Sequence, residues 1–250
     1  MDLDLGGRSA LVTGGARGIG FAICELLAGE GARVVIADID PEGAGTAAAK
    51  LTAAGGIAFA VAGDVSDHAA AREMVTAAEA VAGPLDVLVN NAGVWFVKKF
   101  VESDPATWAT EFGVNTHGVL NMCHAALPGM LERRRGAIVS VTSEAGRVGE
   151  PRTAVYSAAK AAVIGFTRAV AKEVAPGGVR VNCVALGTIR TPGTEASFAP
   201  HLWPRIAEGY PLGRTGDPGD AAAAVAFLAS DRSGWVTGQT YGVNGGYTMP

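Results

Sequence analysis

A tyrosine and a lysine that could act together in proton transfer lie four residues apart in the chain, as Tyr156 and Lys160. The alanine-rich, apolar pattern of residues 154–174 predicts a helix, in which positions i and i+4 share one face. The phenol and the ammonium would then enter the same space. Ser143, which follows a predicted strand, could donate a hydrogen bond to the same substrate oxygen.

The use of this pair depends on the pKa of the phenol, which is about 10 when free and makes tyrosine a poor base at neutral pH. A cation about 5 Å away favours the phenolate by a few kcal/mol at an effective dielectric of about 20. This predicts a pKa lowered by roughly two to three units, so that Tyr156 moves a proton near neutral pH. The alternative is a core tyrosine and a solvated lysine, because the pair alone is a weak motif.

The composition favours a globular α/β enzyme. The chain has 250 residues, of which 49% are hydrophobic, 18% are charged and 35 are glycine. These values suit a buried sheet and argue against disorder. The net charge of −4 and the lack of a basic block beyond residues 133–135 disfavour nucleic acid as a partner.

The cysteines and histidines indicate neither a disulfide framework nor a metal site. Three scattered cysteines and four isolated histidines have no ligand spacing. The acidic amino terminus enters a strand at once, which is not typical of a signal peptide, and no apolar run approaches membrane-spanning length. We therefore expect a protein of the reducing cytoplasm with no membrane partner.

A glycine-rich turn lies between a predicted strand at residues 9–13 and a helical pattern at residues 21–29. Its spacing is G-x-x-x-G-x-G, with Gly14, Gly18 and Gly20, rather than the G-x-G-x-x-G of many dinucleotide folds. Such a turn lets backbone N–H groups approach a pyrophosphate at the positive end of a helix. A glycine turn can be ordinary turn chemistry, but the strand–turn–helix context predicts dinucleotide binding.

The second predicted strand, residues 33–37, ends at Asp38. An acid at this place can accept hydrogen bonds from the adenosine ribose hydroxyls and repels the extra phosphate of NADP. Asp40 adds to the negative charge, whereas Arg17 offers a phosphate some positive charge. The sequence therefore predicts NAD in preference to NADP. The alternative is that Asp38 only caps the helix after Pro41.

Two further strand ends carry polar residues. The strand predicted at residues 57–62 is followed by Asp64, which could face the adenine or cap the following helix. The strand predicted at residues 85–89 runs into an Asn-Asn-Ala-Gly motif at residues 90–93. Because the carboxyl ends of the strands form the ligand crevice of a doubly wound sheet, we predict that Asn91 holds the cofactor or the central loop.

A long amphipathic helix is predicted over residues 105–133, with Asn115 in its middle. Asparagine is a poor residue for a helix interior. Its apolar neighbours Phe112 and Val114 indicate a buried polar role, such as ordering a water molecule. The alternative is a kink in the helix.

The rest of the chain completes the pattern of an α/β fold. Strands are predicted at residues 136–141, 180–185 and 240–243, and a helix at residues 218–229. Between them, residues 191–216 combine aromatic residues with Pro and Gly, which is typical of a substrate lid. With no linker or repeat, we predict one domain over residues 1–250, a three-layer, doubly wound parallel sheet of about seven strands with helices on both faces.

Together these motifs resemble the short-chain dehydrogenase/reductase family along essentially the whole chain. The residues that carry the resemblance are Thr13, Gly14, Gly18, Gly20, the motif at 90–93, Asn115, Ser143, Tyr156, Lys160, Val181 and Asn182. The resemblance implies a catalytic tetrad of Asn115, Ser143, Tyr156 and Lys160, and a homotetramer formed by two long helices and the carboxyl-terminal segment. It implies a nicotinamide cofactor held by Gly14, Arg17, Gly18, Ile19, Gly20, Asp38, Asp64, Val65, Asn91, Ala92, Gly93, Tyr156, Lys160, Ile189 and Thr191.

The chain departs from the family at Leu186, where a proline is usual. The loss of proline could loosen the loop beside the nicotinamide but removes no chemical group. A finer likeness of framework segments, among them residues 147–149 and 237–239, is to bacterial dehydrogenases of alicyclic hydroxyacyl-CoA thioesters and to 3-oxoacyl thioester reductases.

The expected activity is reversible hydride transfer between a secondary alcohol and NAD, with Tyr156 as general acid/base. The alternatives are an NADPH-dependent 3-oxoacyl thioester reductase and a dinucleotide-sensing protein without catalysis. We expect the substrate pocket to be lined by Trp95, Phe96, Glu144 and Arg152 together with the 191–216 segment. Arg147, Arg152 or Arg190 could meet an anionic group of the substrate.

Overall fold

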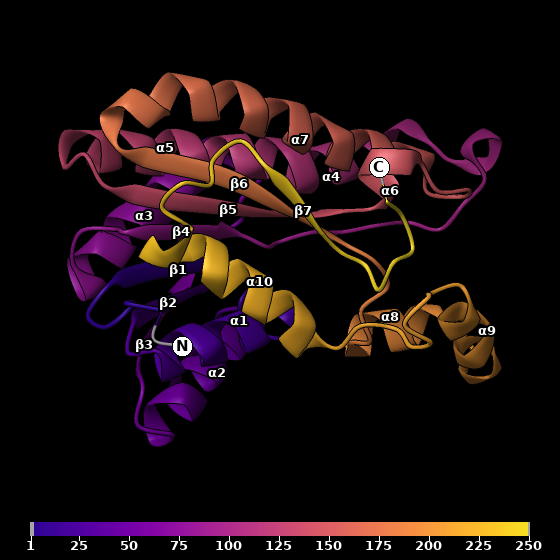
Figure 1. Cartoon of the computed structure of the whole chain (residues 1–250), viewed down its shortest axis with the longest axis horizontal. Helices are drawn as coiled ribbons and strands as arrows, with labels where there is room; N and C mark the ends of the chain where they lie inside the picture. Colours follow the sequence, from indigo (N-terminus) through magenta and orange to yellow (C-terminus); the bar gives the residue numbers. More distant parts are fainter. Residues whose placement is uncertain (1–2, 250) are drawn as a thin grey trace.

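The computed structural model describes residues 3–249, so the first two residues of the acidic amino-terminal segment lie outside the described residues. Residues 3–249 form a seven-stranded parallel sheet in the order β3-β2-β1-β4-β5-β6-β7 (Figure 1). The strands are β1 Ser9–Thr13, β2 Arg33–Asp38, β3 Ile57–Ala62, β4 Val87–Asn90, β5 Gly136–Ser143, β6 Val179–Leu186 and β7 Thr240–Val243. The predicted fold class is confirmed, and the predicted strand bounds differ from these by at most two residues.

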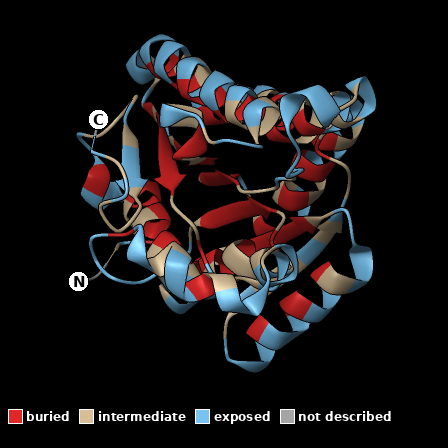
Figure 2. Cartoon of the chain, turned by 90° about the vertical axis from the view of Figure 1, so that its right-hand side faces the viewer, coloured by how far each residue is buried: buried red, intermediate tan, exposed pale blue. Residues whose placement is uncertain are grey.

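Helices cover both faces of the sheet and leave its central strands buried (Figures 1 and 2). One layer consists of α1 Gly18–Gly29, α2 Pro41–Ala53 and α10 Pro218–Ala229, and the other of α3 His68–Ala82, α5 Gly118–Glu132 and α7 Ala154–Val174. All residues of β1 and β4 are buried. This explains why these strands are continuous apolar runs rather than alternating patterns.

The strand order reverses between β1 and β4, because β2 and β3 lie on one side of β1 and β5, β6 and β7 extend beyond β4. In such sheets the crevice at the carboxyl ends of the strands, beside the reversal, is where ligands bind. The glycine-rich turn follows β1 and the Asn-Asn motif begins at the end of β4. The topology therefore brings these two motifs to one point.

Asp40 and Asp67 are the residues that cap α2 and α3. Asp40 accepts a hydrogen bond from Gly43 N at 3.1 Å, and Asp67 accepts bonds from the backbone N–H groups of Ala69 and Ala70. The capping alternatives for Asp38 and Asp64 were therefore wrong. Both of those carboxylates remain at the carboxyl ends of their strands.

The single long helix predicted over residues 105–133 was wrong in detail. The structure has α4 Pro105–Phe112, a π-helical turn at Gly113–His117, and then α5. The wider π turn frees a carbonyl of the preceding turn, and the amide of Asn115 donates to the Glu111 carbonyl at 2.9 Å. The polar residue in the middle of the pattern marks this interruption.

Two other elements also depart from the sequence pattern. Helix α1 begins at Gly18, three residues before the predicted start. The predicted lid segment contains two short helices, α8 Pro192–Ser197 and α9 Trp203–Glu208, which lie with α6 Ala145–Val148 at one end of the molecule (Figure 1).

Gly20 has a steric role that makes a stability test possible. A Cβ at this position would overlap the carbonyl oxygen of Gly14 and would lie 2.5 Å from Asn91 Nδ2. We expect Gly20→Ala to lower the free energy of unfolding by about 2–3 kcal/mol. Gly45, in the exposed middle of α2, has open space around its Cβ position. Gly45→Ala should raise the stability by about 0.5–1 kcal/mol.

Denaturant unfolding of the two variants measures both effects. If Gly20→Ala and Gly45→Ala changed the free energy of unfolding by the same amount and in the same direction, the steric role of Gly20 in the turn would be contradicted.

Candidate active site

Helix α7 places Tyr156 and Lys160 in the same space, as the i, i+4 spacing predicts. The Lys160 ammonium lies 5.7 Å from the centre of the Tyr156 ring and donates a hydrogen bond to Val141 O at 2.9 Å. Lys160 is only 4% exposed, so its charge is almost wholly removed from water. The alternative of a solvated lysine is therefore wrong.

The pKa values of the pair differ from the sequence-based expectation. Burial raises the pKa of Tyr156 to about 12, a hydrogen bond with Ser143 lowers it, and the charge of Glu111 raises it further. Burial lowers the pKa of Lys160 to about 8. The predicted depression of the phenol pKa was wrong, because the cost of burying a phenolate outweighs the hydrogen bond with Ser143 that favours it.

Two buried threonines fix the catalytic turn of α7. Thr142 Oγ1 donates to Lys160 O at 3.0 Å, and Thr116 Oγ1 donates to Ala159 O at 3.0 Å. They tie α7 to β5 and to the π turn respectively. Sequence reasoning missed them, because no local signal separates a bonding threonine from an ordinary buried one.

Asn115 is completely buried beside the loop that follows β4. Its Oδ1 accepts from Val94 N at 3.2 Å, and its Nδ2 donates to Val94 O at 2.7 Å. A Cβ on Gly93 would lie 3.0 Å from Asn115 Oδ1 and 3.5 Å from Lys160 Nζ. The Gly93 backbone therefore lies beside two of the four predicted catalytic residues.

The glycine-rich turn is locked to the end of β4 by Asn91. Its Nδ2 donates to Thr13 O and to Gly14 O, both at 3.0 Å, and its backbone N–H donates to Thr13 Oγ1 at 3.0 Å. Gly14, at φ +62°, has the left-handed conformation that favours glycine. Of the two roles predicted for Asn91, these contacts favour holding the central loop. Sequence reasoning named Thr13 among the residues of the motif but did not assign it this contact.

The start of α1 has the features of an anion site. Arg17 is the residue before the helix, it makes no side-chain cap, and the first turn of α1 carries no acidic side chain. The N–H groups of Gly18, Ile19 and Gly20 are thus not capped by the preceding side chain, at the positive end of the helix. These residues fit the pyrophosphate of a dinucleotide.

The other predicted cofactor residues lie at neighbouring strand ends. Asp38 accepts from Ala16 N and from Asp40 N, each at 3.1 Å, which leaves acceptor capacity for a ribose. Asp64 accepts from the backbone and the hydroxyl of Ser66. Val65 is buried, and a Cβ on Gly118 of α5 would lie 2.7 Å from its side chain.

The segment after β6 reaches back over the glycine-rich turn. Ile189 is buried, and Thr191 caps α8 by accepting from Thr194 N at 3.2 Å. A Cβ on Gly18 would lie 3.6 Å from the Thr191 side chain.

Leu186 is buried and continues β6 by pairing with Ser143 and Val243. The position of the usual proline is therefore part of the sheet here.

Three residues predicted to line the substrate pocket or to meet an anionic group have partners within the protein: Glu144, Arg147 and Arg190. Glu144 is 2% exposed and accepts from Arg147 Nη1 at 3.0 Å and from the hydroxyl of Thr248. Glu144 thus holds the carboxyl-terminal segment at Thr248, and Arg147 pairs with Glu144. Arg190 is engaged with Glu195 at 2.8 Å.

The two aromatic residues predicted for the pocket, Trp95 and Phe96, have different neighbours. The Trp95 ring would lie 3.5 Å from a Cβ on Gly193, at the start of α8. Phe96 and Arg152 line a small cavity together with Glu111. Glu111 is a buried carboxyl that sequence reasoning missed, because its charge suggested an exposed helix face.

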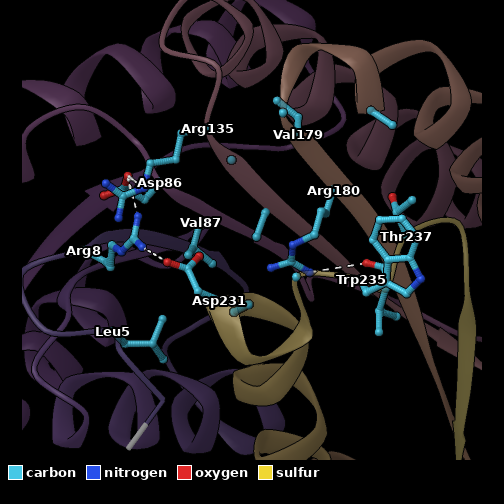
Figure 3. Close-up of a pocket in the computed structure, with 17 residues that line it drawn as sticks. Leu5, Arg8, Asp86, Val87, Arg135, Val179, Arg180, Asp231, Trp235 and Thr237 are labelled. Carbon is cyan, nitrogen blue, oxygen red and sulfur yellow. Dashed lines mark hydrogen bonds and ion pairs between the residues drawn. The ribbon is translucent and has the colours of Figure 1, made fainter.

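A cavity of about 460 Å³ lies at the opposite edge of the sheet, at the amino ends of β4, β5 and β6 (Figure 3). Its charged groups satisfy one another. Arg8 pairs with Asp86 and Asp231, and Arg180 donates to the carbonyls of Leu228 and Ser230. This cavity contains none of the predicted catalytic residues.

Two further searches of residues 3–249 gave negative results. In that part of the chain no group of three or more His, Cys, Asp or Glu could hold a metal ion. None of its helices combines the length and apolar character needed to cross a membrane.

Comparison with known proteins connects this arrangement to a family. A family model described as enoyl-(acyl carrier protein) reductase matches residues 14–248. The 2-(S)-hydroxypropyl-CoM dehydrogenase 3 of Xanthobacter autotrophicus is 40% identical over 242 residues, which cover 95% of each chain. The acetoacetyl-CoA reductase of Shinella zoogloeoides is 42% identical over 96% of this chain and 98% of its own.

A reductase of Chlamydia muridarum, the 3-oxoacyl-[acyl-carrier-protein] reductase FabG, is 39% identical over 96% of both chains. The crystal structure of gox2181 superposes with a TM-score of 0.95 at 36% identity, over 98% of this chain and 97% of that one. With the turn after β1 and the Tyr156–Lys160 pair in place, the chain belongs to the short-chain dehydrogenase/reductase family, NAD(P)-dependent oxidoreductases that act on CH–OH groups.

Proposed function

We propose that this enzyme interconverts a secondary alcohol and a ketone with NAD as the preferred cofactor, and that Tyr156 is its general acid/base. The observation that carries the proposal is the convergence of Tyr156 and the buried Lys160 at the carboxyl ends of β4 and β5. Bound nicotinamide supplies the hydride acceptor, or the donor in the reverse direction.

The chain's own residues handle the proton and the oxygen. In alcohol oxidation, the Tyr156 oxygen takes the hydroxyl proton as the carbinol carbon loses its hydride; in ketone reduction it returns the proton. Ser143, which shares a hydrogen bond with Tyr156, donates to the substrate oxygen and stabilises its developing charge. The Lys160 ammonium opposes the cost of forming a phenolate and binds the nicotinamide ribose. Asn115 orders the backbone at Gly93 and a water that links Lys160 to solvent.

The cofactor site is assigned to the turn after β1 and to the neighbouring strand ends. The N–H groups at the start of α1, between Gly14 and Gly20, hold the pyrophosphate, and Asp38 accepts from the adenosine ribose. Asp64, Val65 and the 90–93 motif surround the adenine and the central part of the cofactor. Ile189 and Thr191 close over the nicotinamide end.

The substrate lid is assigned to residues 191–216. Helices α8 and α9 stand at one end of the molecule, and Tyr210 anchors the far side of the segment by accepting from Thr188 N at 2.7 Å. The Arg190 guanidinium lies 5.2 Å from the Trp203 ring, which gives the segment an aromatic inner contact. Such a lid excludes water during hydride transfer.

The assembly proposed is a homotetramer of single-domain chains in the cytoplasm. Exposed apolar side chains at Trp235, Tyr241 and Met249 support contacts through the carboxyl-terminal segment. The reducing compartment is supported by three buried free cysteines among the described residues. Light scattering of the purified protein tests the assembly.

The second candidate is an NADPH-dependent 3-oxoacyl thioester reductase. The names of the FabG and acetoacetyl-CoA reductase relatives favour a thioester, and Asp38 argues against the phosphate of NADPH. A dinucleotide sensor without catalysis is less well supported, because the chain keeps all four tetrad residues.

Removal of the phenol hydroxyl tests the assignment of Tyr156. We expect Tyr156→Phe to lower kcat by at least about 10³-fold, because no other group can carry the proton, while NADH binds with unchanged Kd. The matched control is Tyr241→Phe on β7, which should retain full turnover. Retained turnover in Tyr156→Phe would remove this residue from the mechanism.

Removal of the Asp38 charge tests the cofactor preference. The repulsion between Asp38 and a 2′-phosphate predicts that Asp38→Ala reduces the ratio of kcat/KM for NAD over NADP by about 10–100-fold. Glu42→Gln, which removes an exposed carboxylate in the first turn of α2, serves as the control and should leave the ratio unchanged. An unaltered ratio in Asp38→Ala would refute the preference for NAD.

The substrate class is tested by comparing a hydroxyacyl-CoA thioester with the corresponding free secondary alcohol, by following NAD reduction. Turnover of the thioester alone assigns the enzyme to acyl thioester chemistry. Turnover of the free alcohol alone would rule out the thioester as the substrate class and would indicate a small apolar pocket beneath the lid.

A further inference from the structure

The carboxyl-terminal turn, residues 244–248, follows β7 and contacts two segments that are far apart in the sequence. Figure 1 shows this end of the chain beside α6. The turn is closed by Asn244, whose Nδ2 donates to Thr248 O at 2.9 Å and whose Oδ1 accepts from Gly246 N at 3.0 Å. The two sides of the turn are therefore held in a fixed relation to each other.

One side of the turn holds the end of the proposed lid. Leu212 N donates to Gly245 O at 3.1 Å, and the ring of Tyr247 lies 5.3 Å from that of Tyr210. Tyr210 is buried, and its hydroxyl accepts from Thr188 N at 2.7 Å, in the segment that follows β6. The turn thus supports both the lid and the loop after β6.

The other side of the turn holds the segment between β5 and α7. The hydroxyl of Thr248 donates to Glu144, the residue after Ser143, and the hydroxyl of Tyr247 donates to Glu150. The bond to Glu150 raises the pKa of Tyr247 to about 12, so the phenol remains a donor at neutral pH. Hydrogen bonds to an ionised acceptor are stronger than those between neutral groups.

Glu150 connects this contact to the first turn of α7. Its backbone N–H donates to Ser157 Oγ at 3.3 Å, and its carbonyl accepts from Thr153 Oγ1 at 3.2 Å. Ser157 is next to Tyr156 in the helix, and Thr153 lines the small cavity together with Arg152. The bond between the carboxyl-terminal turn and Glu150 therefore bears on residues around the catalytic phenol.

We propose that Tyr247 is a positioning residue that ties the proposed lid to the segment before α7, so that the two walls of the substrate site keep one spacing. The inference rests on the proposed function, which places the substrate between these walls. The pyrophosphate and ribose contacts proposed for the cofactor come from other segments, at the ends of β1 and β2. The role of Tyr247 therefore concerns substrate affinity rather than cofactor affinity.

The test variant is Tyr247→Phe, which removes the hydroxyl and keeps the ring beside Tyr210. For the better of the two substrates compared above, we expect KM to rise about 5–10-fold and kcat to change less than about twofold, while the Kd of NADH stays unchanged. The side chain is 39% exposed, so the Tm should change little. Tyr241→Phe on β7 is the matched control and should leave KM unaltered.

A double-mutant cycle tests whether the hydroxyl acts through Glu150. Glu150→Gln keeps a side-chain oxygen that accepts from Tyr247 and should retain most of the wild-type affinity for substrate. Glu150→Ala should raise KM as Tyr247→Phe does. The double variant should be no worse than either single variant, because all three remove the same bond.

Hydrogen exchange provides a readout that needs no substrate. Glu150 lies on one side of the carboxyl-terminal turn, and the N–H groups of Thr188 and Leu212 are bonded on the other side. In Glu150→Ala these two amides should exchange faster than in the wild type, while the amide of Leu11 in β1 keeps its rate.

The outcomes separate this inference from the proposed function. An unchanged KM in Tyr247→Phe, additive effects in the cycle, or faster exchange confined to residues beside Glu150 would each overturn the role of Tyr247 and leave Tyr156 catalysis intact. A loss of kcat/KM that comes with a lower Tm or with an altered assembly in light scattering would assign Tyr247 a structural role only and would also overturn it. Full turnover of Tyr156→Phe would instead defeat the proposed function.

Discussion

The burial of the Lys160 ammonium is the constraint on which the site depends. An almost unexposed cation requires a fixed acceptor, and it finds one in the Val141 carbonyl of β5, at 2.9 Å. That bond, with the bonds of Thr142 and Thr116 to the α7 backbone, fixes the rotation of α7 about its axis. The direction of the Tyr156 phenol follows from this rotation. A cation free in solvent would neither orient the helix nor act strongly on a phenol, because water would screen it.

The parallel sheet explains why the remaining groups meet at the same place. Parallel strands all end on one edge, so the turn after β1, Asp38 at the end of β2 and the Asn-Asn motif at the end of β4 lie side by side. Asn91 joins two of these ends through its amide, and Gly93 lies beside Asn115 and Lys160. The cofactor residues therefore need no element of their own, only short segments that follow buried strands. The proposed lid, in contrast, is a separate segment that follows β6.

Most of the fold was predictable, because buried parallel strands and helical periodicity are local signals. The start of β4 was predicted two residues too early. The sequence also did not predict that residues 105–133 divide into α4, a π turn and α5, because a single asparagine does not distinguish a kink from a wider turn. Within the site, spacing predicted that Tyr156 and Lys160 share one face, which is a property of the helix alone. The pKa of Tyr156 was predicted with the wrong sign, because desolvation depends on side chains that come from distant parts of the chain. For the same reason the buried roles of Glu111 and Glu144 had no sequence signal, as charged residues on helices are usually solvated.

The central claim is that the edge formed by β1, β4 and β5 carries out direct hydride transfer to the carbon of a carbonyl group. The most direct test is reduction of a ketone or 3-oxoacyl thioester by NADH carrying deuterium at nicotinamide C4, followed by mass spectrometry of the product, with each C4 epimer used in turn. The account predicts that one epimer gives a product with a single deuterium on the new carbinol carbon and that the other gives none. Product without label from both epimers, or label exchanged with solvent, would contradict it.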